Sequence, residues 1–233
     1  MLGDLLNNLL FKQATVTALR ELSPHFRQLS LEAGWLKGLV YSRGDKLQVQ
    51  VEPPFTLRTF TPLELDATRG TMQLLVFAHG DTPAGRWVRA LKPGAGINVF
   101  GPRRSLELEP QGGDALLFGD ETSFAVAADW QRVRAPTRPL RCVFEVTDAA
   151  ESKAVLSGLG LGHAQVVEKR PGHLVDIEAY VRSVLGDQPG SHLVLTGQGA
   201  SIQTLRKALR APAAPHADQR VKAYWARGKR GLD

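Results

Sequence analysis

The sequence predicts two halves of different architecture, a small antiparallel β-barrel or sandwich followed by an α/β half with a parallel sheet. Short alternating segments separated by turn residues fill the first half. From about residue 112, apolar runs alternate with stretches of helical spacing. The 233 residues suffice for two domains of ordinary size. We expect the boundary near Glu109–Gly113, which gives domains at residues 1–110 and 111–233.

Three strands and one helix are expected in the first half. The segment KLQVQV (46–51) alternates polar and apolar residues, as a half-buried strand does. TMQLLVFAH (71–79) and GINVFG (96–101) are further strand candidates, with turn signals between them. AGRWVRALK (84–92) is expected to form a helix that a Pro-Gly pair ends.

Strands and helices are expected to alternate in the second half. ALLFG (115–119) is a continuous apolar run, typical of a strand buried on both faces. Further strands are expected at 140–146, 164–169, 192–197 and 220–225, and helices at 121–130, 149–159, 176–186 and 200–210. In the third of these helices, Asp176 is the expected N-cap. One face of that helix carries Ile177, Tyr180, Val181, Val184 and Leu185.

Composition and charge narrow the classes of partner. The net charge of +6 and the pI of about 9.7 favour an anionic ligand. We see no helix-turn-helix, zinc-finger or RNP-type motif, so nucleic acid is not the expected partner. The histidines are scattered and no metal site is expected. One cysteine, no signal peptide and no apolar run of membrane-spanning length predict a cytoplasmic protein without membrane insertion.

Two strand ends in the second half carry glycine followed by a helix. In LLFGDETSF (116–124), Gly119 permits close approach of another backbone, and Asp120 and Thr122 lie where a helix is expected to begin. Such a helix start favours phosphate, although an ordinary N-cap gives the same pattern. LTGQGAS (195–201) repeats this arrangement at Gly197. Two such ends in one parallel sheet indicate a nucleotide site, without a G-x-G-x-x-G fingerprint.

Two segments of the first half combine cations, hydroxyls and rings. In LRTFTP (57–62), Arg58 can engage two phosphate oxygens, Phe60 offers a flat face, and the two threonines offer hydroxyls. A flavin nucleotide would use all of these groups. In FAHGDTPAGRWVRA (77–90), the opening of a helix offers amides to a second anion, with Arg86 beside them. Trp87 is interpreted as the core anchor of that helix.

Five segments in order, RTFTP, HGDTPAGRWVRAL, GPRRSLEL, LLFGDETSF and AYWARGKRG, resemble the siderophore-interacting proteins. These are ferric-siderophore reductases within the ferredoxin-reductase-like flavoenzymes. The resemblance covers roughly residues 15–230, and GDET and the tail are its most specific parts. It implies an N-terminal antiparallel Greek-key barrel that binds FAD and a C-terminal parallel-sheet domain that binds NADH or NADPH.

The resemblance also implies site residues. The FAD contacts would be Arg58, Thr59, Phe60, Thr61, Phe77, Ala78, His79, Ala84, Gly85, Arg86 and Trp87. The nicotinamide nucleotide would face Gly119, Asp120, Glu121, Thr122 and Gly197, and Tyr224 and Trp225 would close the tail over the flavin region. Apart from the resemblance, our candidates for positive charge toward the chelate are Lys46, Arg103, Arg104, Arg227, Lys229 and Arg230, with scattered solvated cations as the alternative interpretation. The sequence departs from the family pattern at Phe60, where tyrosine is usual, at Thr82, where glycine is usual, and at Thr196-Gly197-Gln198 in place of Ala-Gly-Glu.

The function implied is that of an FAD-dependent ferric-siderophore reductase, an oxidoreductase in which the flavin and no catalytic side chain performs the chemistry. The substrate would be a ferric siderophore or another anionic Fe(III) chelate, reduced so that Fe(II) is released for iron assimilation. A general flavin or ferredoxin-type reductase with another acceptor is the alternative. Glu145 or Asp148 could bond a ribose hydroxyl and favour NADH, whereas the arginine surplus favours NADPH. We expect a monomer, with Cys142 in the core.

Overall fold

A computed structural model describes residues 11–54, 56–108, 113–210, 214, 216 and 218–228. The chain forms two compact units, residues 1–107 and 108–233. Of the predicted boundary, residues 109–112 lie outside the described part of the chain. No helix among the described residues is long and apolar enough to cross a membrane.

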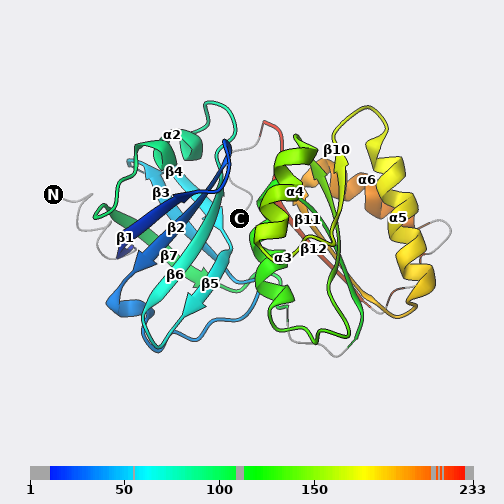
Figure 1. The fold of residues 1–233 in the computed structure, drawn as a ribbon, viewed down its shortest axis with the longest axis horizontal. Coiled ribbons are helices and arrows are strands. Elements are labelled where there is room, and N and C mark those ends of the chain that lie inside the picture. Colours follow the sequence, from blue (N-terminus) through cyan, green and yellow to red (C-terminus); the bar gives the residue numbers. More distant parts are fainter. Residues whose placement is uncertain are drawn as a thin grey trace. The chain divides into compact units, whose positions relative to one another are not determined.

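Among its described residues, the first unit is an antiparallel sheet with the short α-helix α2 (Figure 1). Its strands are β1 (Lys12–Glu21), β2 (Phe26–Glu32), β3 (Lys46–Glu52), β4 (Thr56–Phe60), β5 (Pro62–Asp66), β6 (Thr71–Phe77) and β7 (Gly96–Arg103). The helices are η1 (Gly34–Leu36), a 3₁₀ turn, and α2 (Pro83–Ala90). The predicted strands at 46–51, 71–79 and 96–101 and the predicted helix at 84–92 are confirmed. The strands β1, β2, β4 and β5 were not predicted.

The order of the strands requires the sheet to curl. The order is β4-β3-β7-β1-β2-β6-β5, so β4 and β5 lie at opposite ends of the sheet. Thr61 alone separates these two strands in the chain. Because one residue spans less than about 4 Å, the two ends of the sheet must come together at Thr61. The result is an antiparallel half-barrel, which confirms the predicted barrel class.

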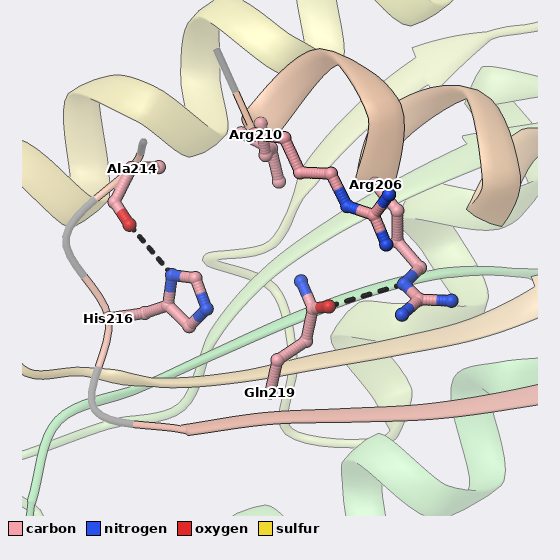
Figure 2. A pocket seen from close by; sticks show the side chains of 6 residues that line it. Arg206, Arg210, Ala214, His216 and Gln219 are labelled. Atoms are coloured by element: carbon pink, nitrogen blue, oxygen red, sulfur yellow. Dashed lines mark hydrogen bonds between the residues drawn. The ribbon is translucent and has the colours of Figure 1, made fainter. Parts of the chain in front are cut away.

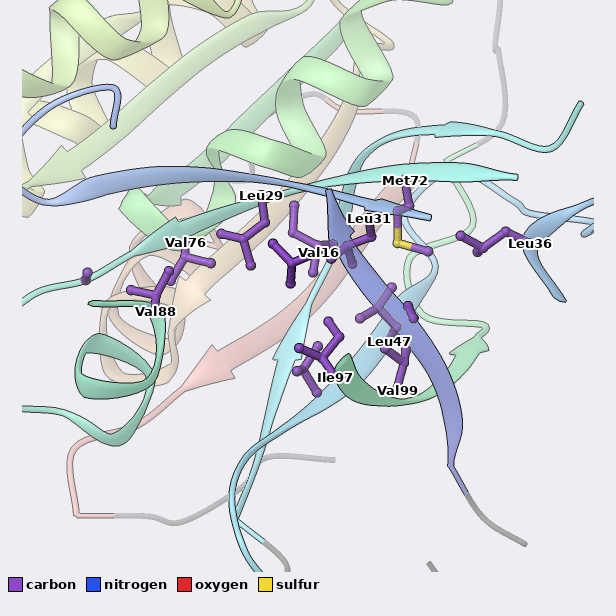
Figure 3. Packing of buried hydrophobic residues seen from close by; sticks show 14 residues of the cluster. Val16, Leu29, Leu31, Leu36, Leu47, Met72, Val76, Val88, Ile97 and Val99 are labelled. Atoms are coloured by element: carbon purple, nitrogen blue, oxygen red, sulfur yellow. The ribbon is translucent and has the colours of Figure 1, made fainter. Parts of the chain in front are cut away.

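The inside of this half-barrel is filled by apolar side chains from most of its strands (Figure 3). The alternation of β3 places Leu47 and Val49 in this core, both fully buried. Helix α2 adds Val88, which is 3% exposed, and Trp87 packs against the same core while partly buried. The interpretation of Trp87 as a core anchor is therefore confirmed. The core fixes α2 beside the sheet.

The second unit is a parallel sheet in which every strand is followed or preceded by a helix. The strands are β8 (Ala115–Asp120), β9 (Arg141–Val146), β10 (Gln165–Glu168), β11 (His192–Gln198) and β12 (Asp218–Trp225). The helices are η2 (Glu121–Ser123), α3 (Phe124–Gln131), α4 (Ala149–Gly158), α5 (His173–Asp187) and α6 (Gly199–Leu209). The predicted alternation is confirmed throughout.

One predicted helix start was wrong. Helix α5 begins at His173 with Gly172 as its N-cap residue, so Asp176 lies inside the first turn. The Asp176 carboxylate forms an ion pair with Arg170 instead of capping the helix. A negative charge in the first turn of a helix also interacts favourably with the helix dipole, so Asp176 still stabilises this helix start. The predicted apolar face is confirmed, since Ile177, Val181 and Leu185 are buried.

The order of the second sheet creates a switch point between two neighbouring strands. The order is β10-β9-β8-β11-β12. After β8 the chain adds β9 and β10 on one side of β8, and it then crosses to the other side of β8 to form β11 and β12. In such sheets, ligands bind beyond the carboxyl ends of the strands that flank the switch. These ends are Asp120 on β8 and Gln198 on β11.

Helices cover both faces of this sheet. Helices α5 and α6 share one core cluster with Phe118, Val143 and Leu195. Phe144 points to the opposite face, where its ring meets that of Phe124 of α3 edge to face at 4.8 Å. The Cys142 thiol is buried at 1% exposed, and burial raises its pKa. The prediction that Cys142 belongs to the core is confirmed.

Candidate functional site

Strand β4 presents the LRTFTP segment at one end of the half-barrel sheet. Thr59 is exposed, while Arg58 and Phe60 are half-buried. The Arg58 guanidinium donates to the Leu57 carbonyl oxygen at 2.7 Å, and no carboxylate pairs with it among the described residues. Arg58 therefore keeps a positive charge that an anionic ligand can engage.

The fold brings this segment next to helix α2. The ring centroids of Phe60 and Trp87 lie 6.3 Å apart and are tilted by 34°. Thr61, at the corner between β4 and β5, is 7% exposed. Phe60 and Trp87, two predicted flavin contacts that are 27 residues apart in the sequence, therefore lie close together in the first unit.

The start of α2 offers fewer free amides than the sequence indicated. Pro83 at the first position has no N–H, and the Thr82 hydroxyl accepts from the Gly85 N–H at 3.2 Å. Among the described residues, Ala84 supplies the first-turn amide to which the structure gives no acceptor. Threonine in place of the usual glycine thus acts as the cap of this helix.

Arg86 is already paired, unlike Arg58. Its guanidinium contacts the Glu52 carboxylate at 2.8 Å and the Asp81 carboxylate at 3.2 Å. The hydrogen bond to Glu52, followed by that to Asp81, raises the pKa of Arg86. A phosphate would have to compete with these two carboxylates. Arg58 is therefore the stronger phosphate candidate of the two.

The end of β6 is held by aromatic contacts. The Phe77 ring stacks on His79 at 4.9 Å and lies 4.9 Å from the ring of Phe26. The Ala78 N–H donates to the His25 carbonyl oxygen at 2.7 Å, so this amide is not available to a ligand. His79 is exposed.

In the second unit, Asp120 caps its own helix start. Its Oδ1 accepts from the Thr122 N–H at 2.9 Å, and its Oδ2 accepts from the Trp225 indole N–H at 2.7 Å. Asp120 is fully buried, whereas Thr122 is exposed. The ordinary N-cap, one of the two interpretations left open by the sequence, describes this helix start. The hydrogen bond from Trp225 to Asp120 also holds the end of β12 against the end of β8.

The glycines Gly119 and Gly197 leave room for neighbouring side chains. A Cβ on Gly119 would lie 2.4 Å from the Cβ of Ser123 and 2.9 Å from the Thr196 hydroxyl. A Cβ on Gly197 would lie 2.7 Å from the Asp120 carboxyl carbon, and Gly197 has a φ of +94°. The close approach expected at Gly119 is therefore made by side chains of the same unit.

Three acidic side chains next to this edge also form hydrogen bonds within the second unit. The Glu121 carboxylate accepts from the Thr147 N–H at 2.5 Å and from the Lys169 ammonium at 2.8 Å. Glu145, a candidate for a ribose contact, is 1% exposed and bonds to His173 at 2.7 Å. Asp148, the other ribose candidate, caps α4 by accepting from the Glu151 N–H at 2.9 Å. Linear sequence gave no signal for the partners of Glu121 and Glu145, because they come from other elements, whereas the Asp148 cap is local.

The cations expected to attract a chelate differ in exposure. Arg104 is exposed and pairs with Glu107 at 3.5 Å. Arg103 donates to the Gln48 side chain at 2.8 Å and lies 4.9 Å above the Phe100 ring. Lys46, expected to be a surface cation, is only 6% exposed at the start of β3. Arg227 is exposed, and Lys229 and Arg230 lie outside the described residues.

We expect an Asp120→Asn variant to change how stability depends on pH. Burial raises the pKa of Asp120, although Thr122, Lys169 and Trp225 favour its charged form. As pH rises above about 4, the unfolded chain loses this proton first, so folding becomes less favourable until the folded pKa is passed. The amide does not titrate. The free energy of unfolding of the unmodified protein, minus that of the variant, should therefore fall as pH rises above about 4.

Urea unfolding at several pH values measures this difference. The variant also changes the contact with Trp225, but that change adds an offset that does not depend on pH. A difference that rises with pH would show that the hydrogen bonds from Thr122 and Trp225, together with the Lys169 charge, outweigh the burial of the carboxylate.

The fold defines the class of this protein. The combination of an antiparallel half-barrel and a parallel five-stranded sheet is the ferredoxin-reductase-like fold. The ferredoxin reductase of carbazole 1,9a-dioxygenase has a TM-score of 0.73 and 14% identity, with 92% of this chain and 69% of that chain covered. The predicted fold class is confirmed.

The comparison with protein families matches one segment of the first unit. Residues 43–106 match the siderophore-interacting FAD-binding domain. This segment contains RTFTP and HGDTPAGRWVRAL, so the resemblance that these motifs indicated is confirmed, and FAD is supported as the cofactor. No curated protein matches the chain.

Two solved structures agree with this match in fold. A siderophore utilization protein from T. fusca has a TM-score of 0.72 and 22% identity, over 96% of this chain and 95% of that chain. The siderophore-interacting protein SipS from Aeromonas hydrophila has a TM-score of 0.73 and 20% identity, over 94% and 93%. At these identities the likeness establishes the fold.

Proposed function

We propose that the protein is an FAD-dependent reductase that passes electrons from NADH or NADPH to a ferric siderophore or similar anionic Fe(III) chelate. In this proposal the first unit binds FAD and the second binds the nicotinamide nucleotide. The observation that carries the proposal is the match of residues 43–106 to an FAD-binding domain, within which Phe60 and Trp87 lie 6.3 Å apart.

The residues of the first unit fit FAD. Its pyrophosphate needs a cation, and Arg58 has no carboxylate partner among the described residues. Its ring system needs flat apolar surface, which the partly buried rings of Phe60 and Trp87 supply. The Ala84 amide at the start of α2 adds a donor for a phosphate oxygen. Arg86 contributes less, because Glu52 and Asp81 already neutralise it.

The chain needs no acid or nucleophile of its own for this reaction. When bound, a flavin takes up a hydride from a reduced nicotinamide nucleotide and gives electrons singly to Fe(III). Arg58 and the helix start hold the phosphates, while Phe60 and Trp87 orient the ring system and keep water from part of it. Reduction to Fe(II) weakens binding by hard, anionic oxygen ligands, so the chelate can release its iron.

The switch point of the second unit supports a nicotinamide nucleotide there. Thr122 is exposed at the end of β8, and Gly197 lies at the end of β11. Asp120 caps this helix start itself, so the nucleotide would contact the edge without a phosphate on the Thr122 amide. Glu145 and Asp148 are both engaged internally. Glu145 is buried, but Asp148 is exposed and uses only its Oδ1 as the cap, so its charge would oppose a 2′-phosphate placed beside it. Both nucleotides should be tested.

An anionic chelate fits the net charge of +6. Arg104 is the exposed cation of the matched domain that we propose to attract it, and Arg227 adds charge in the tail. We place the activity in the cytoplasm, where reduced nicotinamide nucleotides are available and a lone buried cysteine stays reduced.

The visible absorption spectrum tests the proposal. Purified protein, supplied with FAD, should show oxidised-flavin bands that bleach when NADH or NADPH is added without oxygen. Adding a ferric siderophore should restore the bands and produce Fe(II), with two Fe(III) reduced per hydride. A protein that takes up no FAD would contradict the proposal. Bands that bleach but do not return with the chelate would favour a reductase with another acceptor.

We expect an Arg58→Gln variant to bind FAD at least about tenfold more weakly, since a charge-assisted hydrogen bond to phosphate is lost. Arg69→Gln is the matched control, because Arg69 is an exposed cation of the same unit that pairs with Asp66 at 3.5 Å. Arg86→Gln should have a smaller effect than Arg58→Gln. Fluorescence titration with FAD gives the three affinities. Equal affinities for the Arg58 and Arg69 variants would remove Arg58 from the site.

A further inference from the structure

A basic cavity lies at the edge of the second sheet that the proposed function does not use. It has a volume of about 280 Å³ and is lined by Arg206, Leu209, Arg210, Ala214, His216 and Gln219. Helix α6 ends at Leu209 and β12 begins at Asp218, so the cavity lies at the amino-terminal ends of the parallel strands. The proposed nucleotide contacts lie at the carboxyl ends. The two sites are therefore distinct.

Polar side chains of this cavity come from α6 and from the segment that leads into β12. Figure 2 shows Arg206 directed from α6 toward Gln219 and Arg210 directed from the end of α6 toward Arg206, whereas His216 lies beside Ala214. The Arg206 Nε donates to the Gln219 side-chain oxygen at 3.2 Å. This bond leaves the terminal guanidinium nitrogens of Arg206 and the amide NH₂ of Gln219 as donors toward the cavity.

The orientation of His216 follows from its hydrogen bond to Ala214. Its Nδ1 lies 2.8 Å from the Ala214 carbonyl oxygen, which can only accept. Nδ1 therefore carries the hydrogen, and Nε2 is the ring atom that can bind a ligand. In the imidazolium form, Nε2 becomes a further donor.

The two guanidinium groups are not neutralised by the protein. No ion pair joins Arg206 or Arg210 to a carboxylate among the described residues, and Asp218 pairs with His192 and Arg220. Arginines at the end of a helix also compensate the helix dipole, so their charge has an ordinary explanation. Compensation of the helix dipole does not account for the cavity, nor for His216 and Gln219, which also line it. The two permanent positive charges exceed the partial negative charge at the end of the helix. A doubly charged anion would balance them better.

The floor of the cavity is apolar. Leu209 is 3% exposed and Ala214 is 6% exposed. The volume is close to the lower limit of about 300 Å³ for small-molecule sites. We propose that this cavity binds a small phosphate monoester, whose dianionic head engages Arg206 and Arg210 and whose compact apolar group rests on Leu209 and Ala214. The site is independent of flavin and of the proposed reductase activity.

Calorimetric titration of the full chain with phenyl phosphate, at constant ionic strength, tests this proposal. We expect one saturable site, with binding tighter than that of inorganic phosphate, which lacks the apolar group, and of phenol, which lacks the charge. Arg210→Gln should lower the affinity at least about tenfold, because a charge-assisted contact to phosphate is lost. Arg210 is exposed, so the substitution should leave the fold intact.

Lys207→Gln is the matched control, because Lys207 lies in the last turn of α6, just before the Arg210 C-cap, is exposed and does not line the cavity. It removes the same charge and should change the affinity less than twofold. Equal losses from the two variants would overturn the proposal in favour of diffuse electrostatic attraction. The absence of saturation, or equal binding of inorganic and phenyl phosphate, would also overturn it. Repeating the titration with and without FAD separates this result from the reductase test, since the affinity should not change.

Discussion

A Gly197→Ala variant should lose about 2–5 kcal/mol of unfolding free energy, from two separate causes. The φ of +94° at Gly197 lies in a region that costs an L residue about 1–2 kcal/mol. The added Cβ would also lie 2.7 Å from the Asp120 carboxyl carbon, and overpacking of a buried site costs about 1–3 kcal/mol. Because Asp120 also accepts from Trp225, its displacement would loosen the end of β12.

Gly160→Ala separates these two causes. Gly160 has a φ of +78°, is exposed, and would place its Cβ where no atom lies within 4 Å. We expect this control to lose only the backbone cost of about 1–2 kcal/mol. Urea unfolding measures both variants. Equal losses would mean that Asp120 moves away freely, and the close packing between β8 and β11 would not contribute to stability.

A Glu121→Ala variant should lose about 2–4 kcal/mol. The carboxylate of Glu121 is 3% exposed and joins the ends of three strands, because it accepts from the Thr147 N–H after β9 and from Lys169 after β10. Removing one partner of a buried pair costs about 3–5 kcal/mol. We reduce this value because the Lys169 side chain is 30% exposed and partly screened by water.

Two variants give this measurement its controls. Glu121→Gln keeps an acceptor for the Thr147 N–H and should lose less than Glu121→Ala. Glu178→Ala removes a half-exposed partner of Arg182 on α5 and should lose less than about 1 kcal/mol. If Glu121→Ala is no more destabilising than Glu178→Ala, the three strand ends are not held together through this carboxylate.

The predicted site residues of the first unit illustrate how far sequence reasoning reaches. The residue types of LRTFTP led us to predict a flavin nucleotide, because a cofactor with a pyrophosphate and a flat ring would use a cation, hydroxyls and a ring. The spatial relation of Phe60 to Trp87 depended on the curl of the sheet, which brings β4 to α2. The pairing of Arg86 with Glu52 was also invisible in sequence, since 34 residues separate them.

Three of the four missed strands carry little local signal. In β1, only Ala14 and Val16 are buried among ten residues, so most of its side chains carry no hydrophobic signal. Strands β4 and β5 are five residues each and are divided only by Thr61, which has none of the usual turn chemistry. Strands β4 and β5 form because they pair with β3 and β6, not because their own residues favour a strand.

The sequence by itself determined the two-part architecture, the alternation of the second half and the core role of Cys142, because hydrophobic period and chain punctuation are local properties. Tertiary structure decided the roles of Gly119, Gly197 and Asp120, since those roles depend on side chains from other strands. The basic cavity of Arg206, Arg210 and His216 likewise exists only where the end of α6 meets β12. A pattern along the chain reports which residues are buried, and only the fold determines which of them meet.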